Sequence, residues 1–402
     1  MKSMGLPRRI WCRTVQAILR LATPFLPYRA PGLLKSCDEA AALIKANQKR
    51  RVLIVTGANV RAHGLTKPVE DALALHGVAC VIYDKTVANP TVSNIEEAVK
   101  LYRETGCDCL IAVGGGSPMD CAKGVCARLM RPKKSIPELK GALKVHGTKP
   151  LLIAVPTTSG SGSEASVAAV VTDDKTHHKF TVISFSLVPK YALLDPVMTK
   201  TLPPTPTAET GMDALTHAVE AYIGRATTRR TREYAISAVK LIHENLLTAY
   251  ERGDDLEARR NMQLAAYRAG LAFSLSYVGY VHAVAHSLGG KYNYPHGKTN
   301  AILLPVVLRA YGKSCEKRLA KLARASGVCF EQSDSAAARS FIEWIETLNE
   351  KTGIPETLAI KEEDIPALAR IADKEANPLY PVPKLMNAKA LEEIYRLART
   401  KD

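Results

Sequence analysis

The sequence has few aromatic residues, no Cys-x-x-Cys motif and no long apolar run. Aromatic residues make up 6% of the 402 residues, and the nine cysteines include no Cys-x-x-Cys pair. Scattered cysteines argue against a disulfide framework and against a zinc ribbon, so we expect reduced thiols and a cytoplasmic location. The sequence also has no apolar run of about eighteen residues, the length that a membrane-spanning helix needs.

Positive charge is in excess, with a formal net charge of +16. Such an excess can indicate a polyanionic partner. The basic residues are dispersed, however, and form only short clusters at 49–51, 131–134 and 229–230. No nucleic-acid-binding motif accompanies them, and few aromatic rings are available to stack on bases. We therefore expect a solvated basic surface that partly serves an anionic ligand, and no nucleic-acid partner.

Residues 1–37 form a basic N-terminal extension. The stretch from Arg8 to Ala22 is amphipathic and stops before Pro24. A helix of this kind can lie on a membrane surface, but Arg13 and Arg20 interrupt its apolar part. No small-residue cleavage site marks a secretory signal. We favour a helix docked on the body of the protein or on a partner subunit, and we do not expect contact with a membrane.

Between residues 38 and 203, short apolar runs alternate with helical patterns. Four runs have the composition of buried strands: Arg51–Thr56, Val78–Tyr83, Cys109–Val113 and Leu151–Val155. Alternating strands and helices predict a Rossmann-like α/β domain with a parallel sheet. Two later runs, at 180–184 and 191–194, are expected to form a return hairpin or a sheet edge.

The pattern changes at the proline cluster Leu202–Pro206, where we place the domain junction. Convincing strands are absent beyond it, and residues 204–402 are predicted to form an all-helical domain. The first helices of this domain are expected at Thr207–Ile223, Thr231–Arg252, Leu256–Ser276, Val281–Lys291, His296–Tyr311 and Lys313–Ser326.

A glycine-rich segment follows the third predicted strand. Val113–Lys123 reads Val-Gly-Gly-Gly-Ser-Pro-Met-Asp-Cys-Ala-Lys, so that a buried strand runs into three glycines and then into a helix. Glycine lets backbone N–H groups approach an anion, and the helix N-terminus adds the positive end of its dipole. A tight turn alone would need one glycine. The segment therefore favours the binding of a diphosphate.

The ordinary dinucleotide fingerprint is missing from its usual place. After the first predicted strand, residues 57–64 do not fit the Gly-x-Gly-x-x-Gly pattern, whereas Gly160–Ala165 matches it only as an isolated and weak motif. We interpret the latter as a second loop over the ligand. The hydroxyl groups of Thr157, Thr158 and Ser161 are candidate donors to ribose or phosphate.

Five residues in the helical half predict a metal site. Asp213 and His217 are four residues apart, as are His282 and His286, and His296 follows ten residues later. Residues four apart share one face of a helix. A carboxylate with several imidazoles and no thiolate suits Fe(II), Zn(II) or Mn(II). The spacing leaves every one of the five as a candidate ligand, and ordinary polar or core histidines are the alternative.

From about residue 40 to its end, the chain resembles the iron-containing (group III) alcohol dehydrogenases. The resemblance rests on motifs at Gly114–Lys123, Pro156–Glu164, Gly211–Glu220, His282–Gly289 and Pro295–Gly297. It implies hydride transfer between NAD(P)(H) and a small alcohol or aldehyde, with a metal that polarises the substrate oxygen. It further implies Fe(II), or alternatively Zn(II), as the metal, and a homodimer.

The resemblance also divides the metal-site candidates by role. It implies that Asp213, His217, His282 and His296 bind the metal. His286 would not be a ligand and would instead face the substrate and the nicotinamide as a catalytic or positioning residue.

For the nucleotide, the resemblance implies that Asp120 lies near the nicotinamide end. The cofactor contacts that it implies are Asn89, Gly115, Gly116, Ser117, Thr157, Thr158 and Lys179. We add Gly57, which follows the first predicted strand, and Ser161, in the second loop, as further candidate contacts.

Gly57 is a departure from part of the family. In NAD-preferring members that resemble lactaldehyde reductase, an aspartate ends the first strand and bonds the adenosine ribose. Because this chain has Gly57 there and Arg61 nearby, a 2′-phosphate is tolerable, and we expect use of NADP(H), alone or together with NAD(H).

Two alternative functions belong to related classes. A polyol dehydrogenase of the glycerol type is close, but its usual metal set has fewer histidines. A lyase resembling dehydroquinate synthase would need a rich set of basic and amide residues for a polyanionic substrate, and we identify no such set at matching positions.

Overall fold

The computed structural model describes residues 4–176 and 178–400 and divides the chain into two compact units. The α/β unit comprises Pro27–Leu202. Its strands are β1 (Gly32–Leu34), β2 (Arg51–Val55), β3 (Ala79–Tyr83), β4 (Cys109–Gly114), β5 (Gly141–Ala142), β6 (Leu151–Pro156), β7 (Ala168–Thr172), β8 (Lys179–Ile183) and β9 (Tyr191–Leu193). Its α-helices are α2 (Cys37–Ala46), α3 (Ala58–Ala62), α4 (Lys67–Leu75), α5 (Val92–Glu104) and α6 (Gly116–Met130).

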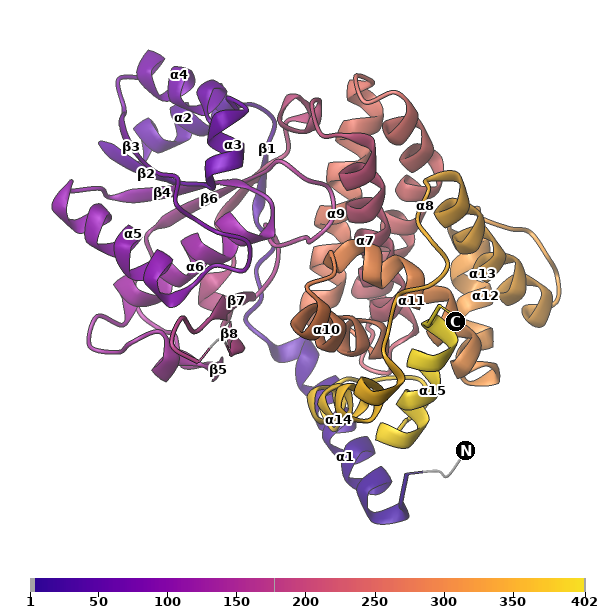
Figure 1. Ribbon diagram of the computed structural model, residues 1–402. Helices are drawn as coiled ribbons and strands as arrows, with labels where there is room; N and C mark the ends of the chain where they lie inside the picture. Colours follow the sequence, from indigo (N-terminus) through magenta and orange to yellow (C-terminus); the bar gives the residue numbers. More distant parts are fainter. Residues whose placement is uncertain (1–3, 177, 401–402) are drawn as a thin grey trace. The chain divides into compact units, whose positions relative to one another are not determined.

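The main sheet has six parallel strands in the order β1-β9-β6-β4-β2-β3. Alternate residues of each strand point to opposite faces. Leu53 and Leu110 therefore pack with α5 and α6 in one apolar cluster, while Ile54 and Ile111 pack with α2 and α4 in another. Figure 1 shows these helix pairs on opposite sides of the strands. The α/β class predicted from the sequence is confirmed.

The strand at Tyr191–Leu193 differs from its prediction as a hairpin or edge strand. It lies inside the main sheet, between β6 and β1, and is parallel to both. The predicted hairpin exists, but it pairs β8 with β7 in a separate three-stranded sheet. β1 at Gly32–Leu34, too short to stand out in the sequence, supplies the outer neighbour that makes β9 internal.

The order of the strands defines where this unit can bind a ligand. From β2, the chain moves to β3 on one side and then returns to β4 on the other. Ligands of open parallel sheets bind outside the carboxyl ends of the strands at such a reversal. Gly57 follows β2 and the three glycines end β4, so these predicted cofactor positions lie at this point of the sheet.

The helical unit comprises Pro203 onward together with the N-terminal segment as far as Leu26. Its α-helices are α1 (Leu6–Ala22), α7 (Pro204–Ile223), α8 (Arg229–Glu251), α9 (Leu256–Ser276), α10 (Tyr280–Tyr292), α11 (His296–Tyr311), α12 (Lys313–Ala325), α13 (Asp334–Lys351), α14 (Ile365–Ala376) and α15 (Ala388–Ala398). The six predicted helices after the proline cluster occur within three residues of their expected bounds.

Helix α7 is the central element of this unit. Proline at its first positions is tolerated because those N–H groups have no partner within the helix, so the proline cluster begins the helix. From Gly211 to Ile223 every residue is buried. A Cβ on Gly211 would lie 2.4 Å from Leu246 Cδ1, so glycine permits the close approach of α8. Side chains of α7 are thereby held in a fixed, dry environment.

The division between the units falls between Leu202 and Pro203, within the proline cluster. Of the predicted extension 1–37, the described residues up to Leu26 belong to the helical unit, and β1 belongs to the main sheet. In the described part of the chain, no helix combines the length and the hydrophobicity required to cross a bilayer.

Candidate functional site

Three of the predicted metal ligands converge in the helical unit. Asp213 and His217 come from one face of α7, and His282 comes from the first turn of α10. Their ligand atoms all lie within 4.8 Å of one another, and all three side chains are buried. The rings of His217 and His282 stack with their centroids 4.4 Å apart. This group offers one carboxylate and two imidazoles without a thiolate.

His296, the first residue of α11, adds a third imidazole beside this group. Its Nε2 atom lies 3.5 Å from Asp213 Oδ1, and its side chain is 42% exposed. Gly297 makes this approach possible, because a Cβ there would lie 2.3 Å from the carbonyl oxygen of Glu209 on α7. All four predicted ligands therefore occur together, although they come from three helices.

The donor set fits a divalent cation. Asn300 Nδ2 lies 2.8 Å from Asp213 Oδ1, 3.0 Å from His296 Nε2 and 3.3 Å from His282 Nε2. One carboxylate oxygen and two imidazole nitrogens therefore lie within 3.3 Å of a single amide nitrogen. Asn300 is fully buried, and its Oδ1 atom has no hydrogen-bond partner in the described structure. Asn300 was not among the residues predicted from the sequence.

Glu220 orients His282 through its Nδ1 atom, and it was not among the residues predicted from the sequence. Its carboxylate accepts hydrogen bonds of 2.7 Å from Gly279 N and 2.8 Å from Val281 N, and it lies 2.7 Å from His282 Nδ1. Because a carboxylate only accepts, Nδ1 carries the proton and Nε2 keeps its lone pair for a metal. Burial raises the pKa of Glu220 to about 7, although the backbone donors favour its ionised form.

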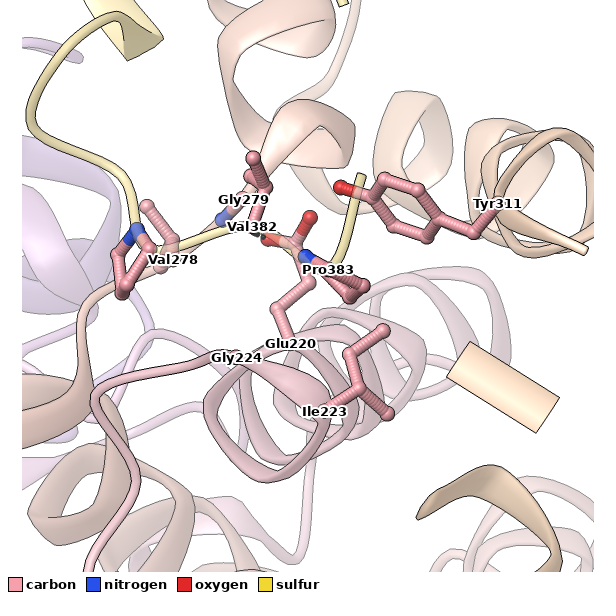
Figure 2. Close-up of a pocket in the computed structure, with 9 residues that line it drawn as sticks. Glu220, Ile223, Gly224, Val278, Gly279, Tyr311, Val382 and Pro383 are labelled. Atoms are coloured by element: carbon pink, nitrogen blue, oxygen red, sulfur yellow. Dashed lines mark hydrogen bonds between the residues drawn. The ribbon is translucent and has the colours of Figure 1, made fainter. Parts of the chain in front are cut away.

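The space around Glu220 is tightly closed. Figure 2 shows its carboxylate directed toward Gly279, at the beginning of α10. A Cβ on Gly279 would lie 2.6 Å from Glu220 Oε1, so only glycine leaves room for this contact. The cavity beside it measures ≈ 10 Å³, enough for one water at most, and Tyr311 and Pro381 are among its lining residues. Glu220 is thus held by protein contacts.

His286 lies beside the ligand set but has a different partner. Its Nδ1 atom lies 2.7 Å from Glu375 Oε1, which also accepts a 2.9 Å hydrogen bond from the Tyr380 hydroxyl. The ring stacks on His296 with the centroids 5.2 Å apart, and the side chain is 42% exposed. Burial opposes protonation, but the charge and hydrogen bond of Glu375 outweigh it and raise the pKa of His286.

In the α/β unit, the glycine-rich loop ends β4 and begins α6. Gly114 has φ +149°, and a Cβ there would meet Pro118 Cγ at 2.5 Å. Gly115 caps α6 without any side-chain hydrogen bond, so the first N–H groups of this helix are left for another acceptor. This arrangement fits the diphosphate that the sequence predicts.

The second loop lies directly beside the first. A Cβ on Gly115 would lie 3.3 Å from Thr158 Oγ1, and a Cβ on Gly116 would lie 3.5 Å from Ser161 Oγ. Thr157 N donates to the Gly114 carbonyl at 3.0 Å. The predicted cofactor residues that follow β4 and β6 therefore lie side by side, and side chains larger than glycine would fill the space between them.

Asn89 and Lys179 are linked to this region by backbone contacts. Asn89 adopts φ 57° and donates from its backbone N to Ser117 Oγ at 3.2 Å. Two residues later, Thr91 bridges to Thr172, which pairs with Lys179 across the β7–β8 hairpin. The exposed Lys179 amine has a lowered pKa because it is partly desolvated.

Asp120 is already engaged within the α/β unit. Its carboxylate accepts hydrogen bonds from Ser163 Oγ at 2.8 Å and from Val170 N at 3.1 Å. The fully buried Lys123, which was not predicted as a site residue, donates from Nζ to Ser163, Ser166 and the Ala168 carbonyl. Burial raises the pKa of Asp120 and lowers that of Lys123 to about 8. Both residues fasten the 163–170 segment to α6, and the position of Asp120 near a nicotinamide stays a prediction.

Gly57 and Arg61 have structural partners of their own. A Cβ on Gly57 would lie 2.9 Å from the carbonyl oxygen of Thr86, so a larger residue needs a backbone shift. Arg61 donates to Thr66 Oγ1 at 2.7 Å and forms an ion pair with Glu70. The charge of Arg61 is therefore partly neutralised within its own unit.

A glycine-rich loop at a sheet reversal, in a chain that also builds a buried carboxylate–imidazole group, is the combination expected of a metal-assisted dehydrogenase. Residues 34–196 match the family model described as iron-containing alcohol dehydrogenase, and residues 207–399 match the C-terminal model of the same family. The chain belongs to the iron-containing alcohol dehydrogenase family, which confirms the resemblance seen in its motifs.

Similar proteins cover most of the chain. The 1,3-propanediol dehydrogenase of Citrobacter freundii is 37% identical and covers 93% of this chain and 97% of its own length. The NADPH-dependent butanol dehydrogenase of Clostridium saccharobutylicum is 34% identical, with 77% and 80% covered. A crystal structure of 1,3-propanediol oxidoreductase superposes with a TM-score of 0.89 at 33% identity, covering 93% of this chain and 99% of that one.

Proposed function

We propose that this protein is an iron-dependent, NAD(P)-linked alcohol dehydrogenase that also works as an aldehyde reductase on small substrates. Family membership makes it an oxidoreductase acting on alcohols. The proposal concerns its metal, its nucleotide and the roles of its residues. The convergence of Asp213, His282 and His296 on one point is the observation that carries it.

Asp213, His217, His282 and His296 would hold the metal. A bound Fe(II) ion supplies a Lewis acid for the oxygen of the alcohol or carbonyl, with Zn(II) as the alternative. Glu220 keeps the His282 proton on Nδ1, so that Nε2 is presented as a ligand.

His286 is the residue that we propose for substrate positioning and proton relay. Oxidation of an alcohol releases a proton from oxygen and a hydride from carbon. Because Nδ1 of His286 is bonded to Glu375, Nε2 is the atom that can accept the hydroxyl proton, or return it during aldehyde reduction. Glu375 also fixes the orientation of the ring, with Tyr380 bonded to the same carboxylate oxygen.

The nucleotide would bind at the reversal in the main sheet. The N–H groups at the start of α6 are suited to its diphosphate, and Asn89, Ser117, Thr157, Thr158, Ser161 and Lys179 are the proposed side-chain contacts. A nicotinamide held there would supply the hydride chemistry.

We propose NADP(H) as the preferred nucleotide, with NAD(H) also accepted. Residue 57 has no carboxylate to repel a 2′-phosphate, and the carbonyl of Thr86 crowds any larger side chain there. One relative carries NADPH dependence in its name. Because Glu70 pairs with Arg61 and partly neutralises its charge, the preference for the 2′-phosphate should be modest, so we expect NAD(H) to be used as well. A homodimer and a cytoplasmic location remain part of the proposal.

An anaerobic assay of Fe(II)-loaded protein tests the function. Oxidation of NADPH and NADH would be followed separately with a panel of small aldehydes, and the reverse reaction with simple alcohols, 1,3-propanediol and glycerol. Glycerol tests the alternative of a polyol dehydrogenase. We expect turnover that a chelator abolishes and Fe(II) restores. Turnover that survives complete metal removal would contradict the proposal.

A further inference from the structure

Helix α1 docks onto the helical unit through its polar side. Arg8 forms two hydrogen bonds of 2.7 and 2.8 Å with the carboxylate of Asp373 on α14. Arg13 donates to the carbonyl oxygens of Val382 and Pro383 at 2.8 and 3.0 Å. Gln16, nearly fully buried, donates to the Tyr380 carbonyl at 2.7 Å. Figure 1 shows α1 beside α14.

The opposite side of α1 presents a row of large apolar side chains to solvent. Its members are Leu6, Ile10, Trp11, Ile18 and Leu21, followed by Phe25 in the next turn, and each is between 58% and 86% exposed. Apart from Trp11, which borders the row, they recur at intervals of four, eight, three and four residues, so they form one stripe along the helix.

This arrangement reverses the usual amphipathic helix of a globular protein, which buries its apolar stripe and exposes its charges. Contiguous exposed apolar surface commonly marks an interaction site. The sequence pattern alone favours a docked helix without membrane contact. The structure shows that docking uses the arginine side and leaves the apolar side uncovered by the described chain, so the exposed stripe is available to a partner.

The charge around the stripe identifies the kind of partner. Residues 1–37 contain seven basic residues and no acidic residue. Arg9 and Arg20 are exposed on α1, and the net charge of the whole chain is +16. Two copies of this helix facing each other would bring cations together without a carboxylate to pair them. An anionic lipid surface would neutralise the arginines and bury the apolar stripe at the same time.

We propose that α1 docks the protein on the surface of membranes that contain anionic lipid. The helix would lie in the plane of the interface, with its apolar stripe at the acyl boundary and the exposed Arg9 and Arg20 at the headgroups. Trp11, an aromatic ring with one polar N–H, suits the same boundary. The proposal is independent of the catalytic activity, because none of these residues belongs to the metal or nucleotide site.

Co-sedimentation of the full-length protein with lipid vesicles tests this proposal. Vesicles of phosphatidylcholine alone would be compared with vesicles that also contain phosphatidylserine. We expect binding to the anionic vesicles at least about tenfold stronger than to the neutral ones, and weaker at high salt because the charges are screened. Replacing Trp11, Ile18 and Leu21 by serine should lower the anionic binding by about tenfold or more.

A matched variant controls for the general loss of exposed apolar surface. Leu75, Phe330 and Leu397 are 80%, 77% and 56% exposed outside α1, and the triple serine variant at these positions should bind like the wild type. Both triple variants should keep the thermal unfolding midpoint and the turnover of the wild type in solution.

Three results would overturn the proposal. The first is a wild-type protein that does not sediment with phosphatidylserine vesicles at low salt. The second is equal vesicle binding by the wild type and the α1 triple variant. The third is an α1 triple variant that changes from dimer to monomer in analytical ultracentrifugation while the wild type ignores vesicles, which would make the stripe a subunit interface.

Discussion

Replacement of Glu220 by glutamine should weaken metal binding without unfolding the protein. The Glu220 carboxylate accepts from three donors, namely the backbone N–H groups of Gly279 and Val281 and the Nδ1–H of His282. A buried donor left without a partner costs about 1–3 kcal/mol, so alanine would strand three donors and destabilise the whole unit. Glutamine keeps the volume and one accepting oxygen, but it points an N–H₂ group at the remaining donors.

The expected loss follows from the role of the His282 partner. Partners that orient a metal-binding histidine contribute about 10–100-fold to metal affinity, or about 1.4–2.7 kcal/mol. We expect Glu220→Gln to lose affinity within that range. The measurement is an anaerobic competition between the protein and a chromogenic chelator for Co(II), in which the visible spectrum of the bound ion also reports its ligand geometry.

Glu233→Gln is the matched control, because Glu233 lies on the neighbouring helix α8 with a 62% exposed side chain. It should bind Co(II) like the wild type. Unaltered affinity and an unaltered Co(II) spectrum in Glu220→Gln would refute the argument that this carboxylate orients His282. A fall in the melting temperature of the metal-free protein would instead report the structural cost of the substitution, so both quantities are measured.

Four further predictions follow from the geometry. His286→Ala should keep its iron, measured by elemental analysis, but lose at least about a hundredfold in kcat, whereas His282→Ala should lose both. Glu375→Gln should lower kcat by about tenfold with its metal content intact, because the His286 ring loses its charged partner. Gly57→Asp should raise KM for NADPH at least about tenfold more than KM for NADH, through repulsion of the 2′-phosphate, with Gly57→Ala as the steric control. Burial lowers the pKa of Lys123 from 10.5 to about 8, so the folded protein releases this proton at a lower pH than the unfolded chain does. Between pH 8 and pH 10.5, the free energy of unfolding of the wild type, relative to that of Lys123→Met, should therefore rise by up to about 3 kcal/mol, measured by urea unfolding.

Each of these predictions has an opposite outcome. Loss of iron from His286→Ala would mean that His286 takes part in metal binding and is not a separate positioning residue. Full activity of Glu375→Gln would mean that the charge of Glu375 beside His286 does not contribute to turnover. Equal effects of Gly57→Asp and Gly57→Ala would make residue 57 a matter of space alone. A stability difference that does not vary with pH would mean that Lys123 is uncharged throughout or fully compensated by its partners.

The strands and helices were largely predictable from the sequence because their apolar periodicity is strong. The short run at Tyr191–Leu193 was not, since its place in the sheet depends on pairing with β1, more than 150 residues earlier in the chain. Local patterns carry no information about such a partner, and a brief apolar run at the end of a domain reads equally well as an edge.

The pairing of the candidate ligands Asp213 and His217 was predictable for a similar reason, whereas the residues that support the site were not. Asp213 and His217 share a helix face through their spacing, which the sequence displays. Glu220 lies on that same face, but the two N–H groups that hold it come from the beginning of α10. Glu375 reaches His286 from a helix 89 residues away. Polar residues at such distances acquire their role only when the tertiary fold brings them together.

The segment on which α1 docks also supports His286 through Glu375. Tyr380 accepts a hydrogen bond from Gln16 through its carbonyl and donates one to Glu375 through its hydroxyl, while Val382, bonded to Arg13, lines the cavity beside Glu220. One stretch of chain is therefore a shared mechanical support for the outer helix and for the two carboxylates behind the histidines. Substitutions at Gln16, remote in sequence from every site residue, should consequently be energetically coupled to Glu375, and a double-mutant cycle on turnover would display that coupling.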